Sequence, residues 1–264
     1  MPELPEVERV RRAVERELAG RTITRVAVAE DRIVYAGVSP RTFAKRLRDR
    51  RIMGAGRRGK YLWLVLDRKP WPCLHFGMTG RLFLYRDARE RPRFHKLDLL
   101  VEGGIRATFS DARRLGRLRL IRDPDIDPPL SALGPDVLDD LPSAVQLGPR
   151  LARRRAPIKA VLLDQALFAG VGNWMADEVL YQSAISPRRL ACELGSPEIL
   201  RLRRALAHVV RVACGTDAIE DRYPAGWLFH VRWDRRRGRT RRGERIVRET
   251  IGGRTAAWVP ERQR

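Results

Sequence analysis

A proline and a glutamate stand at the start of the chain, in the stretch MPELPEVERV, where both could take part in covalent chemistry. Removal of Met1 would make Pro2 the first residue and its nitrogen a free secondary amine. An α-amino group has an ordinary pKa of about 8, against roughly 10.4 for a lysine side chain, so more of it is unprotonated near neutral pH. Such an amine can attack an electrophilic carbon and form an iminium adduct, while the carboxyl group of Glu3 could donate a proton to the leaving oxygen.

A helix is predicted directly behind these two residues. Pro5 suits a first helical position, and acidic residues follow it in the first turn. Apolar residues then recur at helical spacing until Gly20, namely Val7, Val10, Val14 and Leu18. The helix would hold Pro2 and Glu3 on a rigid N-terminal lead. A plainer interpretation, in which the proline and the glutamate only start the helix, fits the spacing as well.

The composition favours a polyanionic partner. The chain of 264 residues carries 54 lysines and arginines against 32 aspartates and glutamates, a formal charge of +22 and a pI near 11.3. Nucleic acid and an anionic membrane surface both suit such a charge. No stretch approaches about 18 uncharged apolar residues, and no signal-peptide pattern opens the chain. We therefore expect a soluble intracellular protein, in the cytoplasm beside the nucleoid of a bacterium or in the nucleus of a eukaryote.

The three cysteines, Cys73, Cys192 and Cys214, are too far apart in sequence for a Cys-x-x-Cys metal site. They also offer no disulfide framework, so buried free thiols are the default expectation. We expect neither a metal ion nor another cofactor.

Hydrophobic periodicity predicts an α+β protein of two domains. Strand-like segments separated by glycine turns follow the first helix, at 21–36, 56–67, 71–85, Leu97–Val101, Ile105–Phe109 and Arg117–Ile121. They predict an N-terminal β-sandwich domain over residues 1–125. A linker is predicted over 126–150, where proline, aspartate and glycine are frequent.

The second half of the chain first favours helices and then strands. Helical periodicity covers Ile158–Phe168, Trp174–Ser183 and the segment from Ser196 to Gly215, which predicts a helical domain over 151–216. Strand signals return over 217–264, at Trp227–Trp233, Arg245–Thr250 and Thr255–Val259, with Gly252-Gly253 as a hairpin turn.

Two glycines interrupt the helical pattern in Ala169-Gly170-Val171-Gly172-Asn173. A glycine turn at a helix N-terminus exposes backbone N–H groups in a positive dipole field, an arrangement that suits a phosphate. The side-chain amide of Asn173 could donate to the same phosphate oxygen. The alternative is an ordinary helical hairpin with no ligand.

The opening MPELPEVE and the segment Ile158–Glu178 together resemble the formamidopyrimidine-DNA glycosylase family, which includes endonuclease VIII. These are bifunctional base-excision repair enzymes. The resemblance implies that Pro2 forms a Schiff base, that oxidised or ring-opened bases are removed, and that the strand is cut by β,δ-elimination. It also implies a helix–two-turns–helix in which Lys159 and Asn173 contact the DNA backbone, with Arg154 as a nearby basic candidate.

Further residues of the N-terminal half match the family's pattern. Lys60, in Arg57–Tyr61, would approach the phosphates beside the lesion and assist elimination. The run His75-Phe76-Gly77-Met78 resembles the loop that inserts a methionine into the duplex, and Asp111–Gly116 resembles a second inserted loop. The implied DNA-contacting residues are His75, Met78, His95, Arg113 and Leu115, with leucine standing where phenylalanine is usual. Plainer interpretations are a solvated basic turn and a methionine that fills the core.

The C-terminal segment departs from the four-cysteine zinc finger of related bacterial enzymes. Arg239, Arg242, Val259 and Arg262 occupy the places of the cysteines, which excludes zinc there. The hairpin core around Arg254 remains, and the segment is similar to the zincless finger of plant-type members. The resemblance implies that Arg254 grips phosphates at the lesion and assists the second elimination. The basic run Arg235–Arg242 suits DNA binding or is only a solvated tail.

The segment Gly215–Gly226 is shorter than the loop that closes over 8-oxoguanine in typical family members. We therefore expect activity on ring-opened purines, oxidised pyrimidines or hydantoins rather than strong activity on 8-oxoguanine. The expected partner is double-stranded DNA with oxidised bases or abasic sites, bound by a monomer and not at a membrane. Two alternatives stay open: a DNA-binding protein that does not cut, and an enzyme whose Schiff-base amine is Lys60.

Overall fold

The computed structural model describes residues 2–233 and 238–264. Its contacts divide the chain into two units. One unit holds Pro2 and Glu6–Ala132, and the other holds Glu3–Pro5 and Leu133–Arg264. The division falls inside the predicted linker, whose second half contains the start of a helix of nine residues rather than irregular chain.

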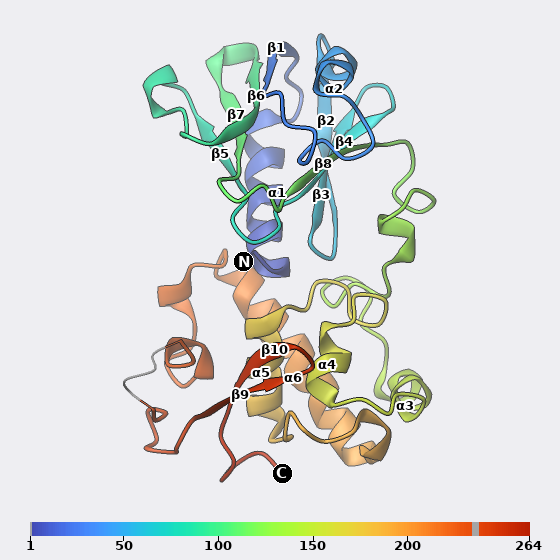
Figure 1. Cartoon of the computed structure of the whole chain (residues 1–264), viewed down its shortest axis with the longest axis vertical. Coiled ribbons are helices and arrows are strands. Elements are labelled where there is room, and N and C mark those ends of the chain that lie inside the picture. Colours follow the sequence, from blue (N-terminus) through green and yellow to red (C-terminus); the bar gives the residue numbers. More distant parts are fainter. Residues whose placement is uncertain (1, 234–237) are drawn as a thin grey trace. The chain divides into compact units, whose positions relative to one another are not determined.

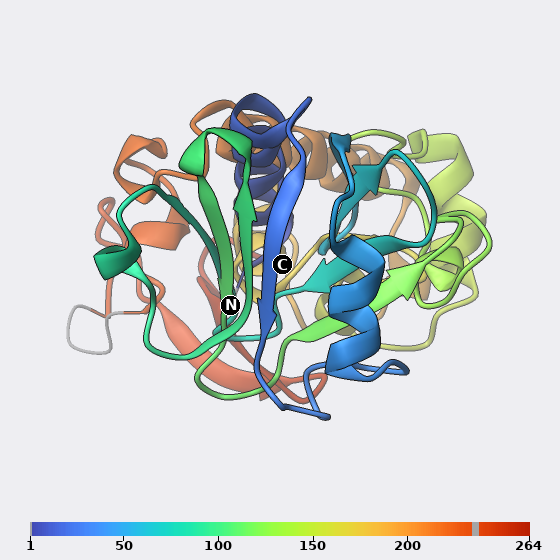
Figure 2. The same cartoon turned by 90° about the horizontal axis from the view of Figure 1, so that it is seen from above.

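The N-terminal unit contains two four-stranded antiparallel sheets and a leading helix, α1 (Leu4–Leu18). The first sheet has the order β1 (Ile23–Val28), β6 (His95–Val101), β7 (Arg106–Ser110) and β5 (Arg81–Tyr85). The second has the order β2 (Ile52–Arg58), β3 (Tyr61–Leu66), β4 (Trp71–His75) and β8 (Arg117–Ile121). Figure 1 labels these strands, and Figure 2 shows them from above. The predicted β-sandwich with a leading helix is confirmed.

The core of this unit is built from apolar residues of both sheets and of two helices. Val7, Val14 and Leu18 of α1 are fully buried in it, at the helical spacing read from the sequence. A second helix, α2 (Pro40–Leu47), was not predicted. Ser39 caps it and Pro40 occupies its first turn, so its start signals are present in the sequence. It packs against β1 and β4 and buries Phe43.

The return strand predicted within 71–85 does not pair with the strand before it. Both edges of β4 are already occupied, by β3 and by β8, so β5 joins β7 in the other sheet. The connection between them contains Gly77, with φ +59°, and Gly80. A Cβ at Gly80 would meet the Phe76 carbonyl oxygen at 2.3 Å, which explains the glycine.

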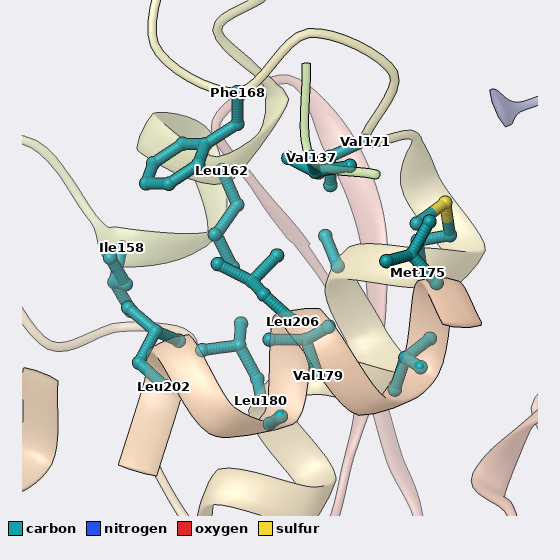
Figure 3. Close-up of a cluster of buried hydrophobic side chains, with 14 of the residues drawn as sticks. Val137, Ile158, Leu162, Phe168, Val171, Met175, Val179, Leu180, Leu202 and Leu206 are labelled. Atoms are coloured by element: carbon teal, nitrogen blue, oxygen red, sulfur yellow. The ribbon is translucent and has the colours of Figure 1, made fainter. Parts of the chain in front are cut away.

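In residues 133–233 and 238–264, the C-terminal unit contains four α-helices and a β-hairpin: α3 (Ala144–Ala152), α4 (Ile158–Leu163), α5 (Asn173–Ser183), α6 (Ser196–Gly215), β9 (Val247–Ile251) and β10 (Arg254–Trp258). Figure 3 shows the core between the helices, where Leu162 of α4, Leu180 of α5 and Leu206 of α6 lie together. The predicted helix–two-turns–helix consists of α4, the glycine-containing turns and α5. The strands β9 and β10 form an antiparallel hairpin around Gly252-Gly253, with Arg254 opposite Ile251.

The strand predicted over Trp227–Trp233 is wrong. The segment forms a 3-10 turn, Leu228–His230, because the buried carboxyl group of Glu178 accepts a hydrogen bond from Phe229 N at 2.9 Å. Rings of Trp174, Tyr223 and Phe229 pack around one another at this place, with centroid separations from 4.9 to 5.7 Å. Alternating aromatic residues therefore form a local cluster here instead of one face of a sheet.

The helix predicted over Ile158–Phe168 ends five residues early, at Leu163. Asp164 follows, and its side chain accepts a hydrogen bond from Ala166 N at 3.0 Å, which turns the chain away from the helical path. In the part of the chain that is described, no helix is long and apolar enough to cross a membrane.

Candidate active site and nucleic-acid interface

Glu3 is seated at the N-terminus of α5. Its Oε1 accepts a hydrogen bond from Trp174 N at 2.9 Å, and its Oε2 accepts one from Met175 N at 3.2 Å. The residue is 2% exposed. Two backbone donors at the positive end of a helix stabilise a carboxylate. Glu3 is therefore held in one orientation by a segment that lies 171 residues away in sequence.

The two glycines before α5 leave space for the Glu3 carboxylate in this position, which we call the seat of Glu3. A Cβ at Gly172 would lie 2.1 Å from Glu3 Cδ, and a Cβ at Gly170 would lie 2.3 Å from Leu4 Cδ1. Gly170 also has φ +103°, which disfavours any other residue. Leu4 N donates to the Gly170 carbonyl oxygen at 3.2 Å. The glycine pattern thus fits the chain start, and Pro2 is the residue immediately before this fixed point.

The seat corrects the expectation that these N–H groups bind a phosphate. The N–H groups of Trp174 and Met175 are bonded to Glu3. The anion at this helix N-terminus is therefore a carboxylate of the protein itself.

Lys159 also differs from its expected role. The side chain is 0% exposed, and Nζ pairs with the carboxylate of Asp177 and donates to the Asn173 carbonyl oxygen at 3.0 Å. The other oxygen of Asp177 accepts from Arg232 and, at 3.2 Å, from Ala257 N. An ammonium group enclosed in this way does not reach a DNA phosphate. The expected backbone contact is corrected to a structural one, which joins α4, α5 and β10.

Asn173 and Arg254 lie at the junction of α5 with the hairpin. Asn173 is half-buried, and its Nδ2 donates to the Thr255 carbonyl oxygen at 3.0 Å. Gly252, with φ +60°, lies against α4, where an added Cβ would approach Ala160 Cβ to 2.6 Å. Arg254 is exposed at the start of β10. The hairpin is thus fixed to both helices while its arginine stays accessible.

Lys60 lies in the two-residue turn between β2 and β3 and is half-buried. The buried guanidinium of Arg57 fixes this turn, because it donates to Glu8 Oε2 at 3.1 Å and to the Gly59 carbonyl oxygen at 3.2 Å. Burial raises the pKa of Glu8, but ion pairs with Arg11 and Arg57 outweigh it and leave that pKa below its ordinary value. A permanent carboxylate on α1 therefore supports the turn that carries Lys60.

His75 ends β4 beside Tyr61, with ring centroids 4.6 Å apart. Burial, together with the positive charges of Lys60, Arg117 and Arg119, lowers the pKa of His75 to about 4. The imidazole is therefore neutral at physiological pH, and it contributes a hydrogen-bonding group rather than a charge.

Asp111 ties two expected DNA-inserting loops together. It is fully buried, and its carboxylate accepts from Thr79 Oγ1 at 2.6 Å, from Arg113 N at 3.2 Å and from Gly116 N at 2.6 Å. Thr79 follows Met78 directly. One carboxylate therefore fixes the loop after β4 and the loop before β8.

The residues expected to enter the duplex are exposed on these loops. Met78 is 41% exposed and Leu115 is 39% exposed, although both are apolar, and Arg113 is also exposed. A Cβ at Gly77 would lie 2.5 Å from the Leu115 carbonyl carbon, so the two loops are in close backbone contact. The structure therefore brings Met78, Arg113 and Leu115 together. Exposed apolar side chains on rigid loops suit insertion between base pairs.

The remaining expected residues are placed as follows. His95 begins β6, where its Nδ1 lies 3.3 Å from the Pro92 carbonyl oxygen. Arg154 is exposed and forms an ion pair with Asp164 at 3.6 Å. Of the basic run 235–242, residues 235–237 lie outside the described part of the chain. Within residues 2–233 and 238–264, no three His, Cys, Asp or Glu side chains gather closely enough to hold a metal ion.

Sequence reasoning missed three residues that organise these sites: Asp31, Asp111 and Asp177. Each is a buried aspartate with several hydrogen-bond donors around it. The available signal for Asp111 is an aspartate that starts a loop ended by glycine, a pattern typical of side-chain-to-backbone turns. Asp177 has no such signal, because its partners lie on three different segments of the chain.

Comparison with known proteins assigns the family. The formamidopyrimidine-DNA glycosylase N-terminal domain matches residues 1–118, and the H2TH domain of the same enzymes matches residues 133–223. The formamidopyrimidine-DNA glycosylase of Arabidopsis thaliana is 37% identical over 277 aligned positions, which cover 100% of this chain and 71% of the plant protein. That of Pelotomaculum thermopropionicum is 35% identical over 278 positions, covering 100% of this chain and 99% of the relative.

Solved structures agree with this assignment. The complex of Lactococcus lactis Fpg with DNA containing an abasic site has a TM-score of 0.88 to this chain, at 25% identity and with 100% of both chains covered. Because a relative more than 30% identical covers the whole chain and two family domains match most of it, the chain belongs to the formamidopyrimidine-DNA glycosylase family.

Proposed function

We propose that this protein, a DNA glycosylase of base-excision repair, releases damaged bases through a covalent adduct on Pro2 and then cuts the strand by elimination. The observation that carries the proposal is the seat of Glu3, because it fixes the residue next to Pro2 by two hydrogen bonds to α5. Two solved structures of a relative support the substrate class. Lactococcus lactis Fpg is bound to DNA containing an abasic site in one and to DNA containing Fapy-dG in the other.

The proposed chemistry begins when the unprotonated Pro2 nitrogen attacks C1′ of the damaged nucleotide. The base leaves with the electron pair of the glycosidic bond and takes a proton from water. The new C–N bond leaves a proton on the Pro2 nitrogen, which passes to the carboxylate of Glu3. Glu3 then delivers this proton to the ring oxygen as the C1′–O4′ bond breaks and the iminium forms. The carboxylate thus relays a proton, which agrees with the two backbone donors that stabilise its charged form.

Strand cleavage follows from the iminium. Its positive charge acidifies the C2′ hydrogen, so water takes that proton while the C3′–O bond breaks and the 3′ phosphate leaves with the electron pair. In the second elimination water takes the C4′ proton, the C5′–O bond breaks and the 5′ phosphate leaves. We propose that Lys60 and Arg254 stabilise the phosphates that leave in the first and second eliminations. Both are basic side chains of β-hairpins, Lys60 in the turn between β2 and β3 and Arg254 at the start of β10. Water then releases Pro2.

DNA binding is proposed to use two groups of residues. Met78, Arg113 and Leu115 would enter the duplex, while His75, His95, Arg154 and Asn173 would contact its backbone. Extruding a nucleotide costs a few kcal/mol and costs least where the base is already weakly paired, so a wedge of exposed side chains favours damaged sites.

The substrate class is proposed from the segment after α6, which is short and whose Tyr223 is packed against Trp174. We propose that ring-opened purines, oxidised pyrimidines or hydantoins are the substrates rather than 8-oxoguanine.

Borohydride trapping tests the proposal. Protein that begins at Pro2 is incubated with duplexes containing one abasic site, one formamidopyrimidine or one 8-oxoguanine, with and without borohydride. We expect nicked product without borohydride and a stable protein–DNA adduct with it, mapped by peptide mass to residue 2. The matched control is the same protein with Met1 retained and verified by mass, because acylation of the Pro2 nitrogen removes the nucleophile.

Two results would contradict the proposal. An adduct mapped to Lys60 would make that side chain the Schiff-base amine. A protein that binds lesion duplexes but neither nicks them nor becomes trapped would be a damage-binding protein without catalysis.

We further propose that this enzyme acts as a monomer without a cofactor, in the compartment that holds the cell's DNA. In a bacterium that is the cytoplasm, at the nucleoid, and in a eukaryote it is the nucleus.

A further inference from the structure

Asp31, which lies between β1 and α2, collects charged partners from two other segments of the N-terminal unit. Arg114 Nε donates to Asp31 Oδ2 at 2.9 Å and Arg114 Nη2 donates to Oδ1 at 3.1 Å, a two-pronged pair. Lys96 Nζ lies 2.9 Å from Oδ2. Ile33 N and Val34 N donate to Oδ1 at 3.1 and 3.3 Å. Asp31 is 5% exposed, so this carboxylate is held from all of these directions.

Arg114 has an unusual backbone conformation for its residue type. Its φ is +58°, in the left-handed region where a residue with a Cβ is strained. It lies between Arg113 and Leu115, the two residues of this loop that we propose enter the duplex. A strained conformation persists where its surroundings determine it, and the bidentate pair with Asp31 is the side-chain contact of Arg114 that contributes to this.

The same loop is held at its base by Asp111. That residue bonds the N–H groups of Arg113 and Gly116, while Asp31 holds the side chain between them. Asp111 N also donates to the Phe94 carbonyl oxygen at 3.0 Å, next to His95 and Lys96. Two buried carboxylates therefore hold the loop, one through its backbone and one through Arg114.

We propose that Asp31 and Arg114 are positioning residues, which clamp the Asp111–Gly116 loop so that Arg113 and Leu115 are already oriented when DNA binds. The guanidinium of Arg114 is bonded to Asp31 in the structure. The same carboxylate pairs with Lys96. It therefore connects the segment that carries His95 with the loop that carries Arg113, and both of these residues are expected to contact DNA. The inference rests on the proposed insertion of Arg113 and Leu115.

The test compares Asp31→Asn, Arg114→Met and the double variant. Asparagine keeps an oxygen that accepts from Ile33 N and Val34 N, so the turn at residue 31 is retained while the ion pairs are lost. Single-turnover nicking of a formamidopyrimidine duplex is measured with each of the four bases opposite the lesion. We expect each single variant to slow nicking roughly tenfold to a hundredfold and to reduce the differences in nicking rate between the four opposite bases. The double variant should be no slower than either single variant.

Two further measurements separate positioning from other roles. The salt dependence of DNA affinity should keep its slope in Arg114→Met, because a lost phosphate contact would reduce that slope by about one unit. Amide hydrogen exchange of the free proteins should become faster at residues 112–116 in both single variants and stay unchanged in the sheets. A structural defect of the whole unit would instead raise exchange throughout.

The neighbouring exposed pair Glu30–Arg41, 3.8 Å apart, is the matched control. Glu30→Gln and Arg41→Met remove the same charges beside the clamp and should leave nicking and exchange unchanged. The proposal would be overturned, in favour of a phosphate contact, by the following pair of results. Arg114→Met lowers the slope of the salt dependence of DNA affinity by about one unit, while Asp31→Asn nicks as fast as the original protein. Unchanged exchange at 112–116 in Asp31→Asn would also overturn it. If the original protein fails to nick, the proposed function fails, while the exchange result still decides the clamp.

Discussion

Glu3 and Gly172 are in such close contact that a single added carbon would separate them. A Cβ at Gly172 would lie 2.1 Å from Glu3 Cδ, well inside the distance at which two carbon atoms can approach. The backbone of Gly172, with φ −120°, is one that any residue adopts. The glycine is therefore required by the carboxylate and not by the conformation of the chain.

Gly172→Ala is expected to lower the rate of base release about a hundredfold or more while the protein stays folded. The methyl group displaces Glu3 from Trp174 N and Met175 N, and displacement of a catalytic group by about 1 Å is enough for such a loss. Single-turnover kinetics on a formamidopyrimidine duplex and circular dichroism measure the two effects.

Gly148→Ala is the matched control for this variant. Gly148 lies inside α3, and the nearest atom to an added Cβ is Ile199 Cδ1 at 4.0 Å. Alanine should stabilise this helix by about 0.5–1 kcal/mol and leave nicking unchanged. If Gly172→Ala nicks as fast as the original protein, the seat of Glu3 has no part in catalysis.

Thr79→Val should loosen the loop of Met78 without changing the shape of the side chain. It removes the 2.6 Å hydrogen bond to the buried carboxylate of Asp111. Loss of a hydrogen bond to a charged group is expected to lower the free energy of unfolding by about 1.5–3 kcal/mol and to slow nicking of lesion duplexes. Urea unfolding and single-turnover nicking measure both. Thr24→Val, which removes an exposed hydrogen bond to the Leu100 carbonyl oxygen, should change neither.

Local patterns were sufficient to predict most of the helices and strands. The spacing of Val7, Val14 and Leu18 identified α1, and the glycine turn between Leu97–Val101 and Ile105–Phe109 identified the β6–β7 hairpin, because both depend on neighbours in sequence. The partner of β5 could not be predicted in this way. It depends on β8 having already taken the free edge of β4, a contact made across more than 40 residues.

The candidate site shows the same limit. The types of Pro2 and Glu3 indicated the proposed chemistry, because an amine can form an iminium and a neighbouring carboxyl group can move a proton. The roles expected of Lys60 and Arg254 came from the family resemblance. Contacts between distant segments were not visible. A glycine turn before a helix suits a phosphate, and only the fold shows that Glu3 takes that place, 171 residues from its partner. The resemblance implied that Lys159 contacts DNA, and nothing near this residue in sequence marks Asp177 as its partner.

Lys159→Met tests whether this lysine is structural. It leaves one oxygen of Asp177 buried without its cation, although Arg232 remains on the other. We expect the free energy of unfolding to fall by about 3 kcal/mol, at the lower end for a broken buried ion pair. The salt dependence of DNA affinity should keep its slope.

Arg154→Met supplies the comparison for this slope. Arg154 is exposed, and as a proposed phosphate contact it should lower the salt slope by about one unit while stability changes little. The reverse outcome, a reduced slope and full stability in Lys159→Met, would place Lys159 on the DNA after all.

Glu178→Gln is expected to remove a pH dependence of stability. Glu178 is fully buried, and burial raises its pKa to about 7, against about 4.3 in an unfolded chain. Between these values the folded protein holds a proton that the unfolded protein has lost. The contribution of Glu178 to stability is therefore complete below about pH 4 and decreases as the pH rises through 7, by about 1.4 kcal/mol per unit. Glutamine keeps an oxygen for Phe229 N and does not titrate.

Urea unfolding should therefore show that Glu178→Gln gains stability relative to the original protein between pH 5 and pH 8. In the exposed control Glu193→Gln the difference should stay constant over this range, and a constant difference for Glu178→Gln would mean that Glu178 is ionised throughout.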